Sequence, residues 1–314
     1  MAIHPEAQSI LDLMGRWQRE NGVPPRSQQT VVEQRQWGRR TAELRLAGEM
    51  PPMASVEDVT LATRAGPRPA RVLRPKAGAA GPTFVYVHGG GYVVGSVDET
   101  ELEARRFAMA TGATVVSLSY RLAPEHPWPA GVDDIEDGLL ALAGGAVPGL
   151  DTTGLALAGV SAGAGLVAAA TRRLVLAGRP LVGTLVLLSP WLDMTLTSPS
   201  TEIFATGHQL ERSSLVSFCR DTIPAGMDPG HPELSPARHP VPAGWPRTLV
   251  LAAGCDPLVD DAALFVRRLD EVGVPHALRV VPGMLHGFHG WWQRLPAIAP
   301  DLAWLDTAVR DGWR

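Results

Sequence analysis

Ser161 lies in a stretch whose spacing suits an enzyme nucleophile. Residues 159–163 read GVSAG, which fits the pattern GxSxG. An apolar run precedes this pentapeptide and a helix-forming run of small residues follows it, so the pattern predicts a strand, a sharp turn and a helix. Such a turn lifts the serine hydroxyl above the sheet edge and brings helix N-terminal N–H groups close to a developing negative charge. Taken alone, the pattern also fits a Gly/Ser turn without chemistry.

A glycine run earlier in the chain could supply the groups that stabilise an oxyanion. His88 is followed by three glycines and preceded by the apolar run 83–87. Glycines after an early strand let backbone N–H groups face a cavity without side-chain obstruction. A flexible glycine turn is the alternative. The candidate donors are the N–H groups of Gly89, Gly90, Gly91 and Ala162.

An acid and a histidine follow Ser161 in the chain order of an α/β-hydrolase triad. Asp256 lies in GCDPL, directly after the apolar run 248–252, and His286 lies in PGMLHGF, after the run 278–281. The carboxyl ends of parallel strands meet at one edge of a sheet. We therefore predict that His286 takes the Ser161 proton as general base and that Asp256 orients its ring.

Several neighbouring residues offer alternatives. Asp260 and Asp261 better suit the first turn of a helix, where carboxylates favour the helix dipole. His289 could lie at the surface or line a pocket, and His126, in APEHPWP, more readily fixes a loop than titrates in catalysis. Trp191 follows a strand end and fits a pocket wall or the core equally well.

The pattern of apolar runs predicts an α/β fold with a parallel sheet. Short apolar runs that alternate with helical stretches are typical of central strands covered on both faces. Two weaker segments predict edge strands, Val56–Thr63 and Ala70–Arg74. The central strands are expected at Thr83–Val87, Thr114–Tyr120, Leu155–Val160, Leu185–Leu188, Thr248–Ala252 and Leu278–Val281. The helices are expected at Glu99–Ala110, Val132–Leu142, Ala162–Leu176, Ala262–Val272 and Ile298–Val309.

Two segments fall outside this alternation and predict a cap. Residues 1–50 form an N-terminal helical cap segment, and residues 51–314 form a catalytic domain with a cap insertion at about 195–247. A second helix is expected to start at Thr30, where Thr30 and Glu33 could form a capping box. The first helix carries an apolar stripe that needs a partner surface, made of Ala7, Ile10, Leu11, Met14 and Trp17.

Composition excludes several other classes of protein. The chain has 314 residues, 45% of them hydrophobic, and a formal net charge of -4 without a long basic run, so a nucleic-acid partner is not expected. Cys219 and Cys255 have no zinc-site spacing and suit small core residues of a reducing compartment. The first residues do not form a signal peptide, and no run spans a membrane. We expect a cytoplasmic protein without a cofactor or metal.

Five motifs together resemble the hormone-sensitive-lipase-like esterases, bacterial family IV. They are HGGG at 88–91, SYRLAPEHPWPA at 119–130, GVSAG at 159–163, CDPLVDDA at 255–262 and PGMLHGF at 282–288. The order and spacing agree over nearly the whole chain. The resemblance implies an α/β-hydrolase fold with an eight-stranded, mostly parallel sheet, helices on both faces and a helical cap. It also implies Ser161, Asp256 and His286 as a triad, two of the three glycines plus Ala162 as oxyanion donors, and cofactor-free hydrolysis of short- to medium-chain acyl esters.

The chain departs from the family pattern around the nucleophile. Val160 stands where the family usually has Asp or Thr, and Ala164 stands in place of a glycine. These departures bear on subfamily, pocket shape and mode of homodimer formation. Two other functions on this scaffold remain alternatives. One is a lyase or tailoring enzyme for a natural product, like some plant dehydratases. The other is a non-catalytic binder of a small molecule, like the gibberellin receptors, which lack the histidine that His286 supplies here.

Overall fold

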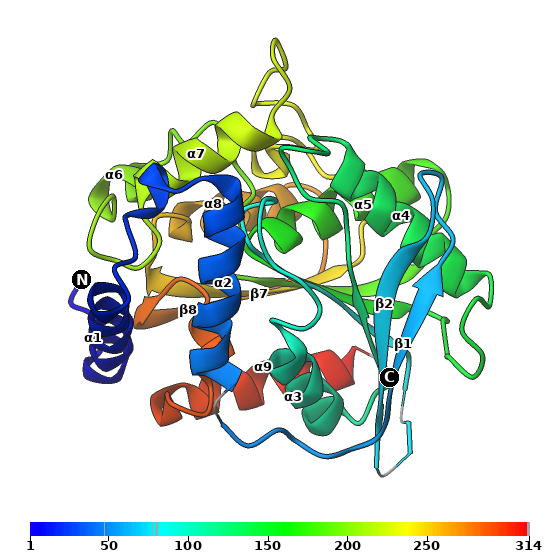
Figure 1. The fold of residues 1–314 in the computed structure, drawn as a ribbon. Helices are drawn as coiled ribbons and strands as arrows, with labels where there is room; N and C mark the ends of the chain where they lie inside the picture. The colour runs from blue at the N-terminus through cyan, green and yellow to red at the C-terminus, as the bar shows by residue number, and fades with distance from the viewer. Residues whose placement is uncertain (47, 77, 80, 313–314) are drawn as a thin grey trace.

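The computed structural model describes residues 1–46, 48–76, 78–79 and 81–312 and contains one eight-stranded sheet (Figure 1). The strands are β1 (Met53–Leu61), β2 (Arg68–Pro75), β3 (Phe84–Val87), β4 (Val115–Leu118), β5 (Leu155–Val160), β6 (Val182–Leu188), β7 (Arg247–Cys255) and β8 (His276–Leu285). Their order in the sheet is β1-β2-β4-β3-β5-β6-β7-β8. β1 and β2 pair antiparallel, β2 pairs antiparallel with β4, and the remaining pairs are parallel. The predicted α/β fold is confirmed.

The segments Val56–Thr63 and Ala70–Arg74 are both predicted to be edge strands, and this is wrong for the second, which lies in β2. β1 is an edge strand and alternates exposed and half-buried residues over most of its length. β2 has partners on both sides, and its Val72 and Leu73 are fully buried. Weak alternation indicates which faces of a strand contact apolar groups, and it does not show whether the strand has sheet partners on both sides.

The helices form two layers around the sheet. They are α3 (Glu101–Thr111), α4 (Ala130–Ala143), α5 (Ala162–Leu176), α8 (Val259–Asp270) and α9 (Ala299–Asp311). In Figure 1, α4, α5 and α8 lie above the sheet, and α3 and α9 lie below it. One apolar core fills the space toward α4, α5 and α8, and a second fills the space toward α3 and α9. The sheet is therefore covered on both faces, as the continuous apolar runs predict.

The N-terminal segment wraps around the sheet edge and crosses the front of the molecule (Figure 1). It contains α1 (Pro5–Glu20), the short 3₁₀ helix η1 (Arg26–Gln28) and α2 (Val31–Leu46). Ala7 and Ile10 of α1 are buried in the core that also contains α9, and the His4 N–H donates to the carbonyl of Gly283 in β8. The apolar stripe of α1 therefore has the end of β8 as part of its partner surface.

The predicted capping box at the start of α2 is present. The Thr30 N–H donates to Glu33 Oε2 at 2.8 Å, and the Glu33 N–H donates to Thr30 Oγ1 at 3.3 Å. Two backbone donors at the helix start are thus satisfied reciprocally. The pair formed by Thr30 and Glu33 therefore marks the start of α2 at Val31.

The segment between β6 and β7 contains two α-helices and a 3₁₀ helix. These are α6 (Pro199–Ile203), α7 (Arg212–Thr222) and η2 (Pro236–Arg238). η1 packs on α7, where the Arg26 guanidinium lies 5.3 Å from the centre of the Phe218 ring. The N-terminal segment and the insertion are therefore in direct contact.

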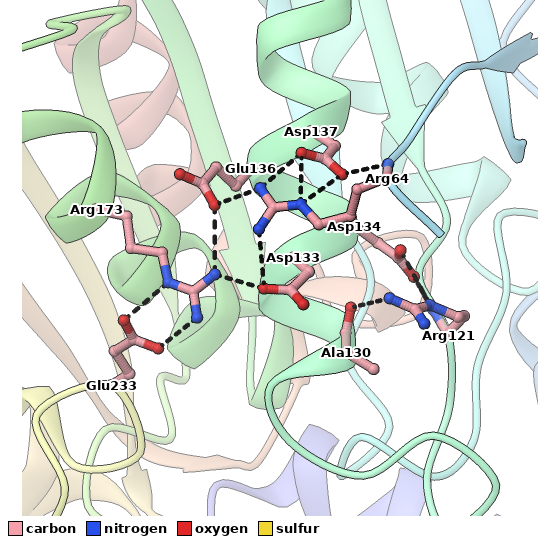
Figure 2. A network of polar contacts seen from close by, with 9 residues as sticks. All are labelled: Arg64, Arg121, Ala130, Asp133, Asp134, Glu136, Asp137, Arg173 and Glu233. Carbon is pink, nitrogen blue, oxygen red and sulfur yellow. Dashed lines mark hydrogen bonds and ion pairs between the residues drawn. The ribbon is translucent and has the colours of Figure 1, made fainter. Parts of the chain in front are cut away.

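An ion-pair network holds the insertion against α4 and α5 (Figure 2). Arg173 of α5 donates to both carboxylate oxygens of Glu233 in the insertion, at 2.8 Å each. It also contacts Asp133 and Glu136 of α4, and Arg64 from the β1–β2 turn reaches the same two carboxylates. Paired, two-point guanidinium contacts fix orientation better than single ones. The network thus aligns the insertion with the helix that follows Ser161.

A more deeply buried pair in Figure 2 pins the chain after β4. Asp134 of α4 has a fully buried side chain and accepts hydrogen bonds from the backbone N–H of Arg121, at 2.8 Å, and from its guanidinium. Arg121 directly follows Tyr120, so this contact fixes the path of the backbone at Tyr120, just after the end of β4.

Candidate active site

Ser161, Asp256 and His286 are each the first residue after a parallel strand, namely β5, β7 and β8. The structure brings the three side chains together in a chain of hydrogen bonds. His286 Nε2 lies 2.9 Å from Ser161 Oγ, and His286 Nδ1 lies 2.7 Å from Asp256 Oδ2. With Nδ1–H donating to the carboxylate, Nε2 is free to accept the serine proton.

The turn at Ser161 is tight and is fixed by backbone contacts. Ser161 has φ 55° and ψ -120°, a conformation that a non-glycine residue rarely adopts. Its N–H donates to the carbonyl of Leu188 at 2.9 Å, and its carbonyl accepts from the N–H of Trp191 at 3.2 Å. β6 and the residues after it therefore hold the serine in this strained conformation.

Both glycines of the GxSxG motif are required by close backbone packing. A Cβ on Gly159 would lie 2.3 Å from the carbonyl oxygen of Gly163. A Cβ on Gly163 would lie 2.4 Å from the carbonyl oxygen of His88. Because both obstacles are backbone atoms, no rotamer change relieves them, and the motif packs α5 directly onto the end of β3.

The carboxylate of Asp256 is buried and bonded through both oxygens. Its residue is 1% exposed, Oδ2 contacts His286, and Oδ1 accepts the N–H of Leu258 at 2.9 Å. Asp260 and Asp261 lie in the first turn of α8, as predicted, and bind other groups. Asp261 accepts the backbone N–H groups of Leu192 and Asp193, so it organises the segment after β6 rather than His286.

The turn that carries His286 is fixed by a serine that sequence reasoning missed. Gly287 has φ 67°, and its N–H donates to Ser189 Oγ at 3.3 Å. Ser189 follows β6 directly, is buried, and has a positive φ of 40°. No sequence motif marks Ser189, so its strained backbone and its contact with the His286 turn can be seen only in the structure.

The glycine loop lies beside Ser161. A Cβ on Gly89 would lie 3.2 Å from the Cβ of Ser161. Gly90 and Gly91 have φ 116° and 61°, so this path of the loop favours glycine at both positions. The predicted donors, the N–H groups of Gly89, Gly90, Gly91 and Ala162, have no acceptor among residues 1–46, 48–76, 78–79 and 81–312.

Tyr120 holds the carbonyl side of this loop and was also missed. Its hydroxyl donates to the carbonyls of His88, at 3.2 Å, and Gly89, at 3.4 Å. Burial raises the pKa of Tyr120 well above its ordinary value, so the hydroxyl stays a donor. In a trans peptide the carbonyl and the following N–H point in opposite directions, so the N–H groups of Gly89 and Gly90 are turned away from Tyr120.

Aromatic side chains pack around the loop. A Cβ on Gly91 would lie 2.3 Å from the Phe218 ring of α7, so the insertion rests directly on the glycine loop. Trp191 is 1% exposed, and its ring centre lies 5.7 Å from that of Tyr92 and 6.3 Å from that of Phe218. Of the two roles left open for Trp191, the structure places it in the core.

The other histidines occupy different environments. His126 is exposed, in the loop between Tyr120 and α4. His289 is 4% exposed, so the surface position, one of the two positions predicted for it, is wrong. Burial lowers the pKa of His88 to about 4, and burial together with nearby Arg106 lowers the pKa of His289 to about 3. Both side chains are therefore neutral at neutral pH.

We expect buried His289 to make the fold sensitive to mild acid. The unfolded side chain takes up a proton near pH 6.5, but the folded one only near pH 3, so protons favour the unfolded state as pH falls through this window. At pH 5 this site should account for about 2 kcal/mol of lost unfolding free energy relative to pH 7. Urea titrations at both pH values should show a smaller difference for His289→Gln than for wild type.

The control for this prediction is His126→Gln, which changes an exposed histidine. Its difference between pH 7 and pH 5 should match that of wild type. An unchanged difference in His289→Gln would contradict the neutral, buried state of His289.

The strand–turn–helix at Ser161, the hydrogen-bonded trio and the sheet order define the class of protein as an α/β hydrolase. The comparisons agree with this. A family model described as "alpha/beta hydrolase fold" matches residues 84–290, and the chain belongs to this family. The resemblance to the hormone-sensitive-lipase-like esterases is confirmed, and the chain is a carboxylic ester hydrolase.

The matched relatives cover most of the chain. It is 32% identical to an ethyl acetate hydrolase of Pseudomonas putida over 92% of both chains. It is 32% identical to the carboxylic ester hydrolase LipN of Mycobacterium tuberculosis, over 81% of this chain and 70% of that protein. The structure of a hyperthermophilic esterase from the archaeon Pyrobaculum calidifontis superposes with a TM-score of 0.91 at 30% identity, over 99% of both chains.

None of the helices in ranges 1–46, 48–76, 78–79 and 81–312 is long and apolar enough to cross a bilayer. Within the same part of the chain, no three His, Cys, Asp or Glu side chains gather in a way that could hold a metal ion.

Proposed function

We propose that the enzyme hydrolyses short- to medium-chain acyl esters through an acyl-enzyme on Ser161. The observation that carries the proposal is the hydrogen-bonded chain from Ser161 through His286 to Asp256. It lies next to a glycine loop whose N–H groups have no acceptor in the described part of the chain. Nucleophile, base, orienting carboxylate and oxyanion donors are the groups that acyl transfer needs.

The proposed reaction has two halves. Ser161 Oγ attacks the ester carbonyl carbon while His286 Nε2 accepts its proton, and the oxyanion receives hydrogen bonds from Ala162 N–H and two of the glycine N–H groups. The tetrahedral intermediate collapses, His286 returns the proton to the leaving alcohol, and the acyl group stays on Ser161. Water then attacks the acyl-enzyme with His286 as base, releasing the acid and restoring the hydroxyl.

We propose that residues 1–50 and the insertion at about 195–247 together form the cap over this site. Two contacts support the assignment. Arg35 of α2 donates through Nε to the carbonyl of Val93, just after the glycine loop, at 2.9 Å. Phe218 of the insertion packs on Gly91 and is covered by Arg26 of the N-terminal segment. A roof built from both segments leaves finite room for the acyl chain.

Acyl length should show a clear optimum. Each methylene buried in the pocket contributes about 0.8 kcal/mol until the space is full, so kcat/KM should rise, peak at short or medium chains and then fall. The measurement is kcat/KM for p-nitrophenyl esters of increasing acyl length. Phe218→Ala should move the optimum toward longer chains, because it removes the ring that rests on the glycine loop.

Val216→Ala is the matched control on the same helix, because Val216 is 46% exposed. Its length profile should equal that of wild type. Steady activity from short esters to long-chain triglyceride would contradict a roofed pocket.

The remaining expectations concern setting and assembly. We propose a small-molecule ester as the only partner in catalysis, a cytoplasmic location and no nucleic-acid partner. The net charge of -4 supports the last of these. We also propose that the protein forms a homodimer, which light scattering of the purified protein would test.

A further inference from the structure

A set of polar and charged side chains, all largely buried except the one-quarter exposed Arg45, lies below the turn that carries His286, on the side of the sheet that α3 and α9 cover. Five elements contribute to it: α2, β3, α3, α9 and the 3₁₀ helix η3 (Phe288–Trp291). We call it the buried charge cluster. It consists of Arg45, Tyr86, Glu103, Arg106, His289 and Asp306.

The two ion pairs of the cluster differ in quality. Arg106 and Asp306 form a two-point pair with both N–O distances at 2.9 Å, so both carboxylate oxygens of Asp306 accept a hydrogen bond from Arg106. Arg45 Nη1 and Glu103 Oε1 are 3.5 Å apart, and the Glu103 side chain is only 5% exposed. Burial raises the pKa of Glu103, and a buried carboxylate depends strongly on the charge of its partner.

The Arg45–Glu103 pair lies against the backbone that follows His286. A Cβ on Gly290 would lie 2.7 Å from Glu103 Oε1 and 3.3 Å from Arg45 Nη1. Gly290 is four residues after His286 and belongs to η3. The pair therefore supports this turn from below, and Arg45 brings α2 into the contact.

Several polar atoms of the cluster lack hydrogen bonds. Among residues 1–46, 48–76, 78–79 and 81–312, the Tyr86 hydroxyl, His289 Nδ1 and Arg45 Nε have no partner. Glu103, Arg45 and Arg106 all act on the pKa of Tyr86, and Arg106, His286 and Arg45 all act on that of His289. In a buried region with little hydrogen bonding, charges interact over longer distances than in water.

We propose that the Arg45–Glu103 pair is a positioning element for His286, which it supports through η3 and whose protonated form it keeps electrostatically balanced. This rests on the proposed role of His286 as the base. Asp256 and Ser161 contact His286 directly, and His289 of the buried charge cluster interacts with it electrostatically. Two guanidiniums and two carboxylates cancel in that cluster, while His289 and Tyr86 are neutral.

The charge balance predicts opposite effects for the two partners. Glu103→Gln leaves a guanidinium without its counter-charge, which disfavours a protonated His286. The acid limb, which is the fall of kcat/KM on acidification, should move to lower pH by about 0.5 to 1 unit. The value of kcat should fall several-fold, with KM little changed. Arg45→Met leaves a carboxylate instead, so its acid limb should move to higher pH. The double variant should return toward the wild-type limb.

Two further variants separate charge from general damage. Arg45→Lys keeps the charge but not the fork of donors, so it should keep the wild-type limb while kcat falls. Glu101→Gln is the matched control on α3, because Glu101 pairs with Arg71 and Arg105 instead of the cluster. Its acid limb should stay in place. Arg45 is one-quarter exposed, so its two variants decide the question even if Glu103→Gln does not fold.

The outcomes distinguish this proposal from the proposed function. Wild-type activity that does not depend on Ser161 and His286 would overturn the proposed function. Activity that depends on both residues, with Arg45→Met and Glu103→Gln limbs that stay in place or move in the same direction, would overturn the positioning role alone. Opposite shifts that cancel in the double variant would support it.

Discussion

Ser161→Ala is expected to lower kcat/KM for p-nitrophenyl butyrate on the order of 10⁴-fold or more. Without the hydroxyl no acyl-enzyme forms, and only oxyanion stabilisation and substrate binding remain. A fluorophosphonate should therefore add to wild type at Ser161 and abolish hydrolysis, and the variant should stay unlabelled. Peptide mass spectrometry after labelling locates the adduct, and steady-state kinetics measures the loss.

Ser117→Ala is a suitable control. Ser117 is a buried serine of β4 whose hydroxyl has no partner in the described part of the chain. This variant should keep wild-type activity and labelling. An adduct on another residue with activity lost, or substantial turnover by Ser161→Ala, would show that Ser161 is not the nucleophile.

His286→Ala should lose on the order of 10³-fold or more in turnover, because the members of a triad act as a unit. For the same reason, the Ser161→Ala/His286→Ala double variant should be scarcely slower than either single variant. In wild type, activity should fall on acidification, since only the neutral imidazole accepts the serine proton. His88 and His289, with pKa values of about 4 and 3, cannot cause a loss that sets in near neutral pH.

His126→Ala is the control for the base, because His126 is exposed and outside the hydrogen-bonded trio. It should keep most of the wild-type turnover and the same acid limb. A large loss in His126→Ala together with retained turnover in His286→Ala would reverse the assignment of the base.

Local sequence signals predicted the fold and the three strand-end residues. The apolar runs of the central strands are nearly continuous because both faces of the sheet are covered. In the GVSAG turn between β5 and α5, backbone lies so close to both glycines that a Cβ would clash at either one. Ser161, Asp256 and His286 meet because the carboxyl ends of β5, β7 and β8 lie at the same edge. Chain order and strand direction suffice to bring them close.

Contacts between distant segments could not be predicted in the same way. Tyr120 and Ser189 fix the glycine loop and the His286 turn through side chains that belong to no periodic pattern. The surface position predicted for His289 is wrong because nothing local shows that α2 and α3 cover η3. The partner of α1 was likewise hidden, since an apolar stripe specifies that a helix is covered but not by which element.

The strained backbone of Ser161 lowers the stability of the fold at the residue that supplies the hydroxyl of the site. A side chain held at φ 55° and ψ -120° costs on the order of 1–3 kcal/mol, a large part of the net stability of a typical domain. Ser161→Gly would remove most of that strain together with the reactive hydroxyl. Laboratory evolution that selects only for heat resistance would therefore favour loss of the Ser161 hydroxyl, and selecting for turnover in each round would oppose that loss.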